Sequence, residues 1–338
     1  MRTTHRLAAF AVVAALCLAP VTASAWGRLG HLIVGELALK TLPEEVPAFL
    51  RSNQAVVDMG EYAREPDRSK GSGKIHDHNR DAAHFVDIDD DGRILGGPMF
   101  TDMQPTRAEY ETALRAAGTD SWKAGYLQYA MIDGYQQMVR DFAYWRVDVA
   151  AGKRAKGAKK AWYKRDRVRR EALLLANLGN LAHYVGDGAQ PLHVTSHYNG
   201  WGDYPNPEGF STERVHQSID ASPALGGVTR DAVLAEMPAA RACDCTINKR
   251  VIDYLLASNA LVTPLYRMIG QGAFTAGDPR GAAFTTGRLA IGAAELRDLI
   301  VMAWRESATV KVGWPQVSVA DIESGKIADP WDNIVGKD

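Results

Sequence analysis

The stretch EALLLANLGNLAHYVGDGAQPLH, residues 171–193, decides the fold. Its apolar residues cover a broad face at helical spacing as far as Asp187, which is typical of a helix buried in a core. The same stretch carries His183, Asp187 and His193. Because residues four apart lie on one face of a helix, His183 and Asp187 should lie one above the other. The stretch therefore predicts a buried helix that presents metal-binding side chains.

Helical patterns dominate the rest of the chain, and strand patterns are scarce. Residues 31–42 have helical spacing and stop before Pro43. Glycine and proline cluster in residues 199–209, which indicates a long loop, and the segment from Gly313 has an irregular pattern. We expect further helices over residues 108–118, 123–150, 161–188, 229–237, 247–270 and 284–308. These patterns predict an all-α, mainly helical single domain with ligands converging from several helices at one end of the bundle, at the bottom of a cleft.

The beginning of the chain has the pattern of a secretory signal peptide. Two arginines precede an apolar run from Leu7 to Leu18, and Ala23-Ser24-Ala25 is a small-x-small cleavage site. The run is too short to be a stable membrane anchor. We therefore expect residues 1–25 to be removed and residues 26–338 to form the domain of a secreted or periplasmic protein.

Cleavage after Ala25 makes Trp26 the first residue of the mature chain, which then begins WGRLGH. The free α-amine and the first carbonyl of such a chain can both bind a metal ion. An amine binds only when it is deprotonated, and a bound ion favours that form. The position of the cleavage site thus provides a possible ligand that no side chain supplies.

Other candidate ligands lie in three further segments. VHQSID repeats the His-x-x-x-Asp spacing with His216 and Asp220, AAHFVDI contains His84, and EPDRSK contains Asp67. Imidazole nitrogens and carboxylate oxygens are ligands that zinc prefers, and a site lacking a full set of protein ligands leaves room for a reactive water. Each segment alone also fits a plain structural role: a surface pair, a core histidine, a solvated loop aspartate. Their recurrence favours a metal site.

Taken together, these residues resemble the zinc-dependent phospholipase C and S-one/P-one nuclease superfamily. Its members begin, after signal removal, with a tryptophan whose amine and carbonyl bind zinc, as Trp26 would. They also carry a His-Asp-Gln-Pro-His segment, which here runs from His183 to His193, and an H-F-x-D element, here His84 to Asp87. The resemblance extends from Trp26 to about Trp304.

The resemblance implies three zinc ions and assigns each candidate ligand to one of them. The first ion would be held by four side chains: Asp67, His84, His183 and Asp187. The second would be held by three: His193, His216 and Asp220. The third would be held by the amine and carbonyl of Trp26, the ring of His31, and the other oxygen of Asp187. Asp58 is the alternative to Asp67, because YAREPD stands where the nucleases usually have a W-A-D element.

Two features favour the nuclease branch over the phospholipase branch. His31 lies five residues after Trp26, whereas phospholipases place it farther along, and the last ligand is Asp220 rather than glutamate. The loop HYNGWGDYPNPEGFSTE, residues 197–213, is instead more similar to the phospholipases in its YP and GF elements. We expect this loop to line the substrate cleft.

The implied chemistry is hydrolysis of a phosphodiester by a zinc-activated water, which requires no protein nucleophile. Asp87 is the candidate catalytic residue that orients the water, and holding a ligand histidine is its alternative role. Phe85 is the candidate substrate-binding residue that stacks on a base, and a place in the core is its alternative. We predict an endonuclease acting on single-stranded DNA and RNA, with 3′-nucleotidase activity also implied. The alternatives are a zinc phospholipase C acting on phospholipid headgroups and a secreted metal-binding protein without catalysis; no obligate protein partner is indicated.

Composition and the remaining motifs add weaker constraints. The net charge of −1 becomes −3 when the two signal-peptide arginines leave, so the chain has no overall attraction for nucleic acid. Ten basic residues between Lys153 and Arg170 either bind phosphates or anionic lipid heads, or form a solvated helix face. DIDDDG, from Asp87, predicts a polar turn rather than a calcium loop, because Pro98 replaces the required glutamate. Cys243 and Cys245 leave both a disulfide and free thiols open.

Overall fold

Helices make up most of the computed structural model, which describes residues 26–220 and 226–336. Helical residues account for 63% and strand residues for 3%, in a single compact body, which confirms the all-α prediction. The predicted signal peptide lies outside the described residues. Among the residues described, no helix is both long and apolar enough to cross a membrane.

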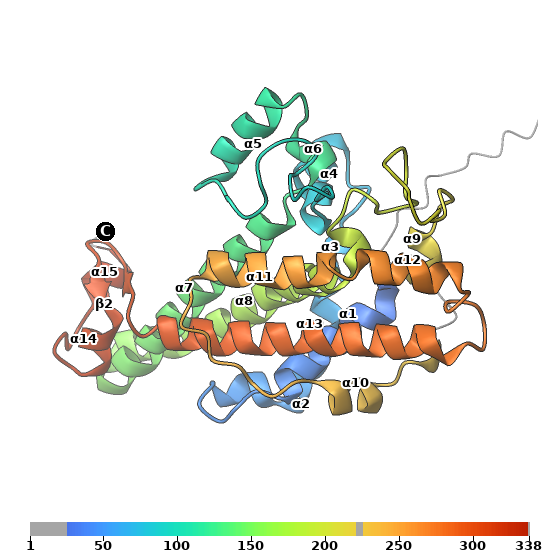
Figure 1. Cartoon of the computed structure of the whole chain (residues 1–338). Helices are drawn as coiled ribbons and strands as arrows, with labels where there is room; N and C mark the ends of the chain where they lie inside the picture. Colours follow the sequence, from blue (N-terminus) through green and yellow to red (C-terminus); the bar gives the residue numbers. More distant parts are fainter. Residues whose placement is uncertain (1–25, 221–225, 337–338) are drawn as a thin grey trace, which may run out of the picture.

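Four helices form the centre of the bundle (Figure 1): α1 (Gly27–Lys40), α7 (Leu127–Arg154), α8 (Gly157–Ala189) and α13 (Pro279–Glu306). Helix α8 contacts the other three and also α2 and α11. Because it has neighbours on several sides, its C-terminal half is buried, as its apolar pattern predicts. The largest hydrophobic core lies among these helices.

The remaining elements are shorter and surround this centre. The other α-helices are α2 (Asn53–Tyr62), α3 (Glu65–Arg68), α4 (Lys74–Arg80), α5 (Arg107–Ala116), α6 (Ser121–Ala124), α9 (His216–Asp220), α10 (Arg230–Glu236), α11 (Ile247–Asn259), α12 (Val262–Gly270), α14 (Val319–Glu323) and α15 (Trp331–Ile334). The 3-10 turns are η1 (Ala48–Arg51), η2 (Asp81–His84) and η3 (Pro191–His193), and the strands are β1 (Lys311–Val312) and β2 (Val317–Ser318).

The helix predicted over residues 247–270 is wrong in one respect, since the structure divides it into α11 and α12. Pro264 explains the break. Proline has no N–H and its ring clashes with a preceding carbonyl, so it is tolerated in the first turn of a helix but not in the interior. The chain therefore ends α11 at Asn259 and starts α12 at Val262, which places Pro264 in a first turn.

The segment from Gly313, expected to be irregular, is more ordered than its sequence pattern indicates. Strands β1 and β2 pair antiparallel around its start, with Val312 opposite Val317. Helices α14 and α15 follow, and their apolar residues pack with the junction of α7 and α8 in a separate cluster that includes Val319 and Tyr163. These elements are too short for periodicity to reveal, and burial against α7 orders them.

Candidate metal centre

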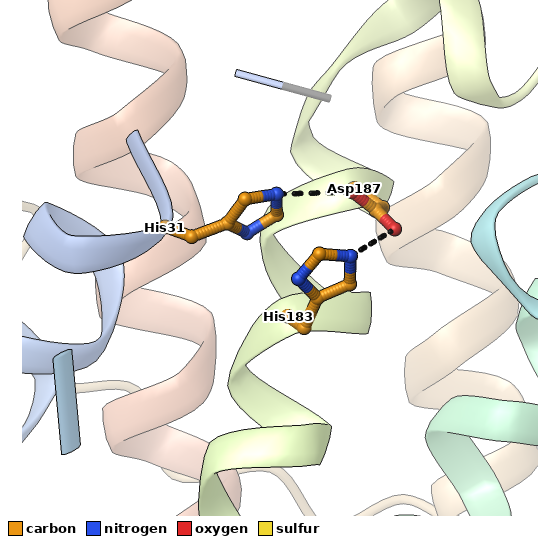
Figure 2. A group of neighbouring side chains, drawn as sticks. All are labelled: His31, His183 and Asp187. Carbon is orange, nitrogen blue, oxygen red and sulfur yellow. Dashed lines mark ion pairs between the residues drawn. The ribbon is translucent and has the colours of Figure 1, made fainter. Parts of the chain in front are cut away.

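Two side chains of α8 form the middle of the site, as their spacing predicts. Nε2 of His183 lies 3.3 Å from Oδ2 of Asp187, and both side chains are fully buried. His31, on α1, approaches from the other side: its Nε2 lies 3.5 Å from Oδ1 of Asp187, and its ring stacks on that of His183 with centroids 3.8 Å apart. Figure 2 shows each of the two rings directing a nitrogen toward the carboxylate of Asp187. The two oxygens of Asp187 therefore face different histidines.

Two more predicted ligands complete this group. His84, at the end of η2, has its Nδ1 2.9 Å from Oδ2 of Asp187 and 2.9 Å from Nε2 of His183. Oδ1 of Asp67, on α3, lies 3.8 Å from the same His183 nitrogen. Asp58, the alternative to Asp67, instead accepts a hydrogen bond from Gln54 on α2. We call His31, Asp67, His84, His183 and Asp187 the first centre.

The last three predicted side chains gather in a second group. Nε2 of His216 lies 3.0 Å from Nε2 of His193 and 2.9 Å from Oδ2 of Asp220. His193 is on η3 and the other two are on α9. All three are buried, and each offers a ligand atom within 4.8 Å of the others. We call these residues the second centre.

Hydrogen bonds to backbone carbonyls orient most of these histidines. Nδ1 donates over 2.6 to 2.9 Å in three cases: His183 to Ala63, His193 to His84, and His216 to Tyr198. A ring that donates through Nδ1 keeps the lone pair of Nε2 free for a metal, which is the usual arrangement of metal-binding histidines. In each case that Nε2 faces its centre.

The donor atoms of both centres suit a divalent metal ion. Within the two centres, four buried atoms have no hydrogen-bond partner: Nδ1 and Nε2 of His31, Oδ1 of Asp187 and Oδ2 of Asp220. A buried polar atom left unsatisfied costs about 1–3 kcal/mol, so a fold that retains several of them at one place indicates a ligand for them. Mixed imidazole and carboxylate donors fit zinc among the common ions. The described residues thus contain three candidate metal groups, two of which share His183.

The charges of the first centre also suit a metal. Burial, and then the neighbouring His183, lower the pKa of His31 to about 3, and burial lowers the pKa of His84 to about 4. Burial alone would raise the pKa of Asp187, but His183 and His193 hold it well below its usual value. Near neutral pH the rings of His31 and His84 are neutral and the carboxylate is ionised, which are the forms that bind metal. Burial lowers the pKa of His183, but Asp187 raises it more, so the net pKa of that ring is raised.

The indole of Trp26 fixes the start of the domain beside the first centre. It is fully buried, and its Nε1 donates to the carbonyl of Gly186, 3.0 Å away, directly before Asp187. Gly186 lets the two helices approach closely, because a Cβ there would lie 3.0 Å from Nδ1 of His31, tighter than an ordinary van der Waals contact. This close approach allows α1 and α8 to bring their ligands together.

The same part of the chain reaches the second centre. A Cβ on Gly27 would lie 3.4 Å from the carbonyl oxygen of Asp220. The backbone of Trp26 and Gly27 therefore lies between the two centres. This is where an α-amine ligand would be needed, and the role of that amine stays a prediction.

A cavity of about 650 Å³ opens onto both centres. Its lining includes His84, His193 and His216 together with Phe85 and Asp87, the two residues predicted for substrate binding and catalysis. Three other aromatic residues and two lysines complete much of the wall: Trp122, Tyr198, Tyr204, Lys70 and Lys123. Tyr198 and Tyr204 belong to the loop of residues 197–213, which was expected to line the cleft.

Asp87 lies in surroundings that disfavour an ionised carboxylate. It is buried, its Oδ1 has no hydrogen-bond partner, and burial, followed by Asp89, raises its pKa well above the usual value. A protonated carboxyl group donates a hydrogen bond rather than accepting a proton. These surroundings favour the protonated form of Asp87, and its role in orienting the water stays a prediction.

The sequence pattern assigned no role to Gln190, which the structure places in contact with a residue of the second centre. Its Nε2 donates to Oδ1 of Asp220 over 2.9 Å, and its Oε1 accepts from the backbone N–H of Leu192. Its position directly before Pro191 was a usable signal, since a residue before proline leaves the helical conformation. Gln190 therefore ends α8 and orients a predicted ligand.

Two further contacts near the site were also missed. Lys70 lies 2.6 Å from Asp67 and offsets its charge. His197, in the cavity loop, contacts Asp90 through Nε2 and the carbonyl of Trp201 through Nδ1, each over 2.9 Å. His197 thus fixes the loop to the polar turn that begins at Asp87 and does not face either centre.

The basic stretch and the cysteine pair lie elsewhere in the molecule. Within the basic stretch, Tyr163 is buried and Lys159 pairs with Asp329 over 2.5 Å, so the C-terminal segment covers part of this face. Cys243 and Cys245 are joined by a disulfide in the segment between α10 and α11. Neither feature contributes to the two centres.

Neither the protein-family models nor the curated proteins include a match to this chain. The structure therefore shows a helical protein with buried His/Asp groups that can hold metal ions. The identity of the ions, the family and the reaction are therefore inferred from the residue pattern and its geometry.

Proposed function

We propose that this protein is a secreted or periplasmic zinc-dependent phosphodiesterase of the S-one/P-one nuclease type, an endonuclease that hydrolyses single-stranded DNA and RNA. The observation that carries the proposal is that histidines of both centres line one cavity that also contains aromatic and cationic side chains. Metal groups alone are compatible with a storage or structural role. Metal groups on the wall of an open cavity of about 650 Å³ favour chemistry on a bound molecule.

The ligand assignment follows the geometry. Oδ2 of Asp187 faces His84 and His183, whereas Oδ1 faces His31, so this carboxylate is suited to bridge two ions. The second centre would hold a third ion. When bound, zinc ions would lower the pKa of a water and neutralise the charge of a phosphodiester.

The chain's own residues would bind and orient the substrate. Phe85 offers a ring to a base, and base–aromatic stacking tolerates any base because each base has a π-face. Asp87 is buried on the same wall, where burial raises the pKa of its carboxyl group, and in its protonated form it would donate to a base acceptor or a phosphate oxygen. The net charge of the mature chain gives no general attraction for nucleic acid, so recognition would depend on this cavity.

The test is a parallel assay of the purified mature protein on single-stranded DNA, RNA and phosphatidylcholine. We expect both nucleic acids to be cut and the lipid to release little headgroup. The Asp187→Asn variant is the control for contaminating nucleases and should be inactive. Ready turnover of phosphatidylcholine with both nucleic acids left intact would reject the nuclease and favour a phospholipase C. Metal binding without turnover of any substrate would favour the non-catalytic alternative.

A further inference from the structure

Trp122 is a large aromatic residue that the fold keeps exposed at the cavity. Its side chain lines the same cavity as Phe85, and 41% of its surface is exposed. Its ring stacks on the imidazole of His78, with centroids 4.8 Å apart and planes within 4° of parallel. The stack on His78 fixes the plane of the Trp122 ring, and the exposed part of the ring can stack on a further planar group.

The backbone around Trp122 is fixed to the segment that carries His84 and Phe85. The N–H of Asp87 donates to the carbonyl of Ala124 over 2.9 Å, and Val86 forms a bridge with Gly125. A Cβ on Gly125 would lie 2.0 Å from the carbonyl oxygen of Phe85, so only glycine allows this approach. The short helix α6 therefore holds Trp122 at a fixed place relative to the first centre.

A cation stands next to this ring. Lys123 follows Trp122 on α6 and lines the same cavity, and it is exposed. Within the described part of the chain it has no ion-pair partner, whereas Lys70, the other lysine of the cavity wall, is paired with Asp67. A flat aromatic ring beside an available ammonium group matches the base and the phosphate of one nucleotide.

We propose that Trp122, supported by His78, is a stacking platform for a second base of a single-stranded substrate, with Lys123 contacting the adjacent phosphate. This inference rests on the proposed nuclease function and deepens it. Phe85 would receive one base and Trp122 another along the strand. In a duplex the faces of each base are covered by its neighbours, so a platform of this kind favours unpaired strands without reading the sequence.

The experiment compares three variants on oligothymidylates of two and eight nucleotides. Trp122→Leu keeps an apolar side chain but removes the π-face, Trp122→Phe keeps an aromatic ring, and Trp314→Leu changes a tryptophan that is 82% exposed on the C-terminal hairpin. For Trp122→Leu we expect KM for the octamer to rise at least about fivefold with kcat within about twofold, because stacking on one base contributes binding. The effect on the dimer should be smaller. Trp122→Phe should retain most of the affinity, and Trp314→Leu should match the wild type.

A binding readout that does not depend on turnover completes the test. A phosphorothioate octathymidylate should quench tryptophan fluorescence in the wild type and in Trp314→Leu, and quench it less in Trp122→Leu. If the wild type cuts single-stranded DNA and Trp122→Leu shows unchanged KM and unchanged quenching, the platform is rejected and the nuclease stands. If the wild type cuts no nucleic acid but releases phosphocholine, both proposals fail together.

Discussion

The two centres differ in what holds their ligands in place. In the first centre, Asp67 and His84 are on short elements, but His31, His183 and Asp187 are on α1 and α8, two long helices packed against each other in the main core. In the second centre, His193 is on a 3-10 turn and the other ligands are on a helix of five residues. Short elements have few internal hydrogen bonds, so the second centre depends on individual side-chain contacts such as that of Gln190.

This difference indicates how each centre would respond to change. Loss of a ligand from the first centre leaves a buried, helix-bound group that cannot move toward another partner. Loss of a supporting contact from the second centre lets a short segment shift. We expect substitutions in the first centre to have the larger effect on metal content and stability. In the second centre we expect metal affinity to depend also on the residues that support the ligands.

The largest effect should come from Asp187→Asn. An amide oxygen is a weaker ligand than a carboxylate, and Asp187 faces histidines through both of its oxygens. The variant should lose more than one zinc ion by elemental analysis, from an expected three, and activity should fall roughly a thousandfold or more, since several kcal/mol of transition-state stabilisation depends on the metals. Asp220→Asn is the matched variant in the second centre and should lose only one. Equal losses in the two variants would contradict the bridging role.

The spacing of His183 and Asp187 was predictable because both lie on one helix, where geometry depends only on local sequence. The approach of His31, Asp67 and His84 was not, because it results from how α1, α3 and η2 pack on α8. The resemblance to zinc nucleases proposed these ligands without giving a physical reason, and the structure supplies one in the contact between Gly186 and His31.

The sequence could not reveal that Gln190 contacts Asp220 or that Trp122 stacks on His78 at the cavity. Gln190 acts on a residue thirty positions away along the chain, and the sequence does not say which distant group an amide will meet. Trp122 is distinguished only by its exposure and by its stack on His78, both of which are tertiary properties. A role that depends on contacts between distant segments can be identified only from the three-dimensional structure. A role that depends on helical spacing can be predicted from the sequence.

The second prediction concerns Trp26, the expected first residue of the mature chain. A protein that keeps one extra residue before Trp26 has an amide in place of the α-amine, and an amide is a very poor zinc ligand at neutral pH. It should lose one zinc ion and about a hundredfold of activity, yet remain folded, because the side-chain ligands of both centres are unchanged. Metal analysis and circular dichroism of the extended and the processed forms provide the comparison. Three bound ions and full activity in the extended form would show that Trp26 is not a ligand.

The third prediction concerns how the stability of the metal-free protein depends on the protonation of His31. The pKa of His31 is about 3 in the folded state against 6.5 when unfolded, so between these values the unfolded chain binds a proton that the folded chain does not. Stability from this group is present above pH 6.5 and is lost as pH falls, by up to about 1.4 kcal/mol per pH unit. Urea unfolding at pH 6.5 and pH 4.5 should show the loss.

Matched variants measure how much of this loss comes from His31. His31→Gln should reduce it by about 2 kcal/mol over two pH units. Burial lowers the pKa of His216, but Asp220 raises it more, so the net pKa is raised. The sign is then opposite: that group stabilises the folded state at low pH, and His216→Gln should not reduce the acid loss. Identical slopes in the wild type and His31→Gln would mean that another group causes the loss.

The smallest effect should come from Gln190→Leu, which removes a support of the second centre and no ligand. Gln190 fixes one oxygen of Asp220, and groups that orient metal ligands change metal affinity by about 10–100-fold. We expect roughly a tenfold weaker affinity for the ion of the second centre, because His216 still contacts the other oxygen, and no change at the first centre. Titration with a competing chelator should reveal one weakened ion. Gln54→Leu is the control, since Gln54 makes the same kind of bond to Asp58 on the surface of α2. If Gln190→Leu weakens all ions equally, the two centres are coupled more tightly than their separate supports indicate.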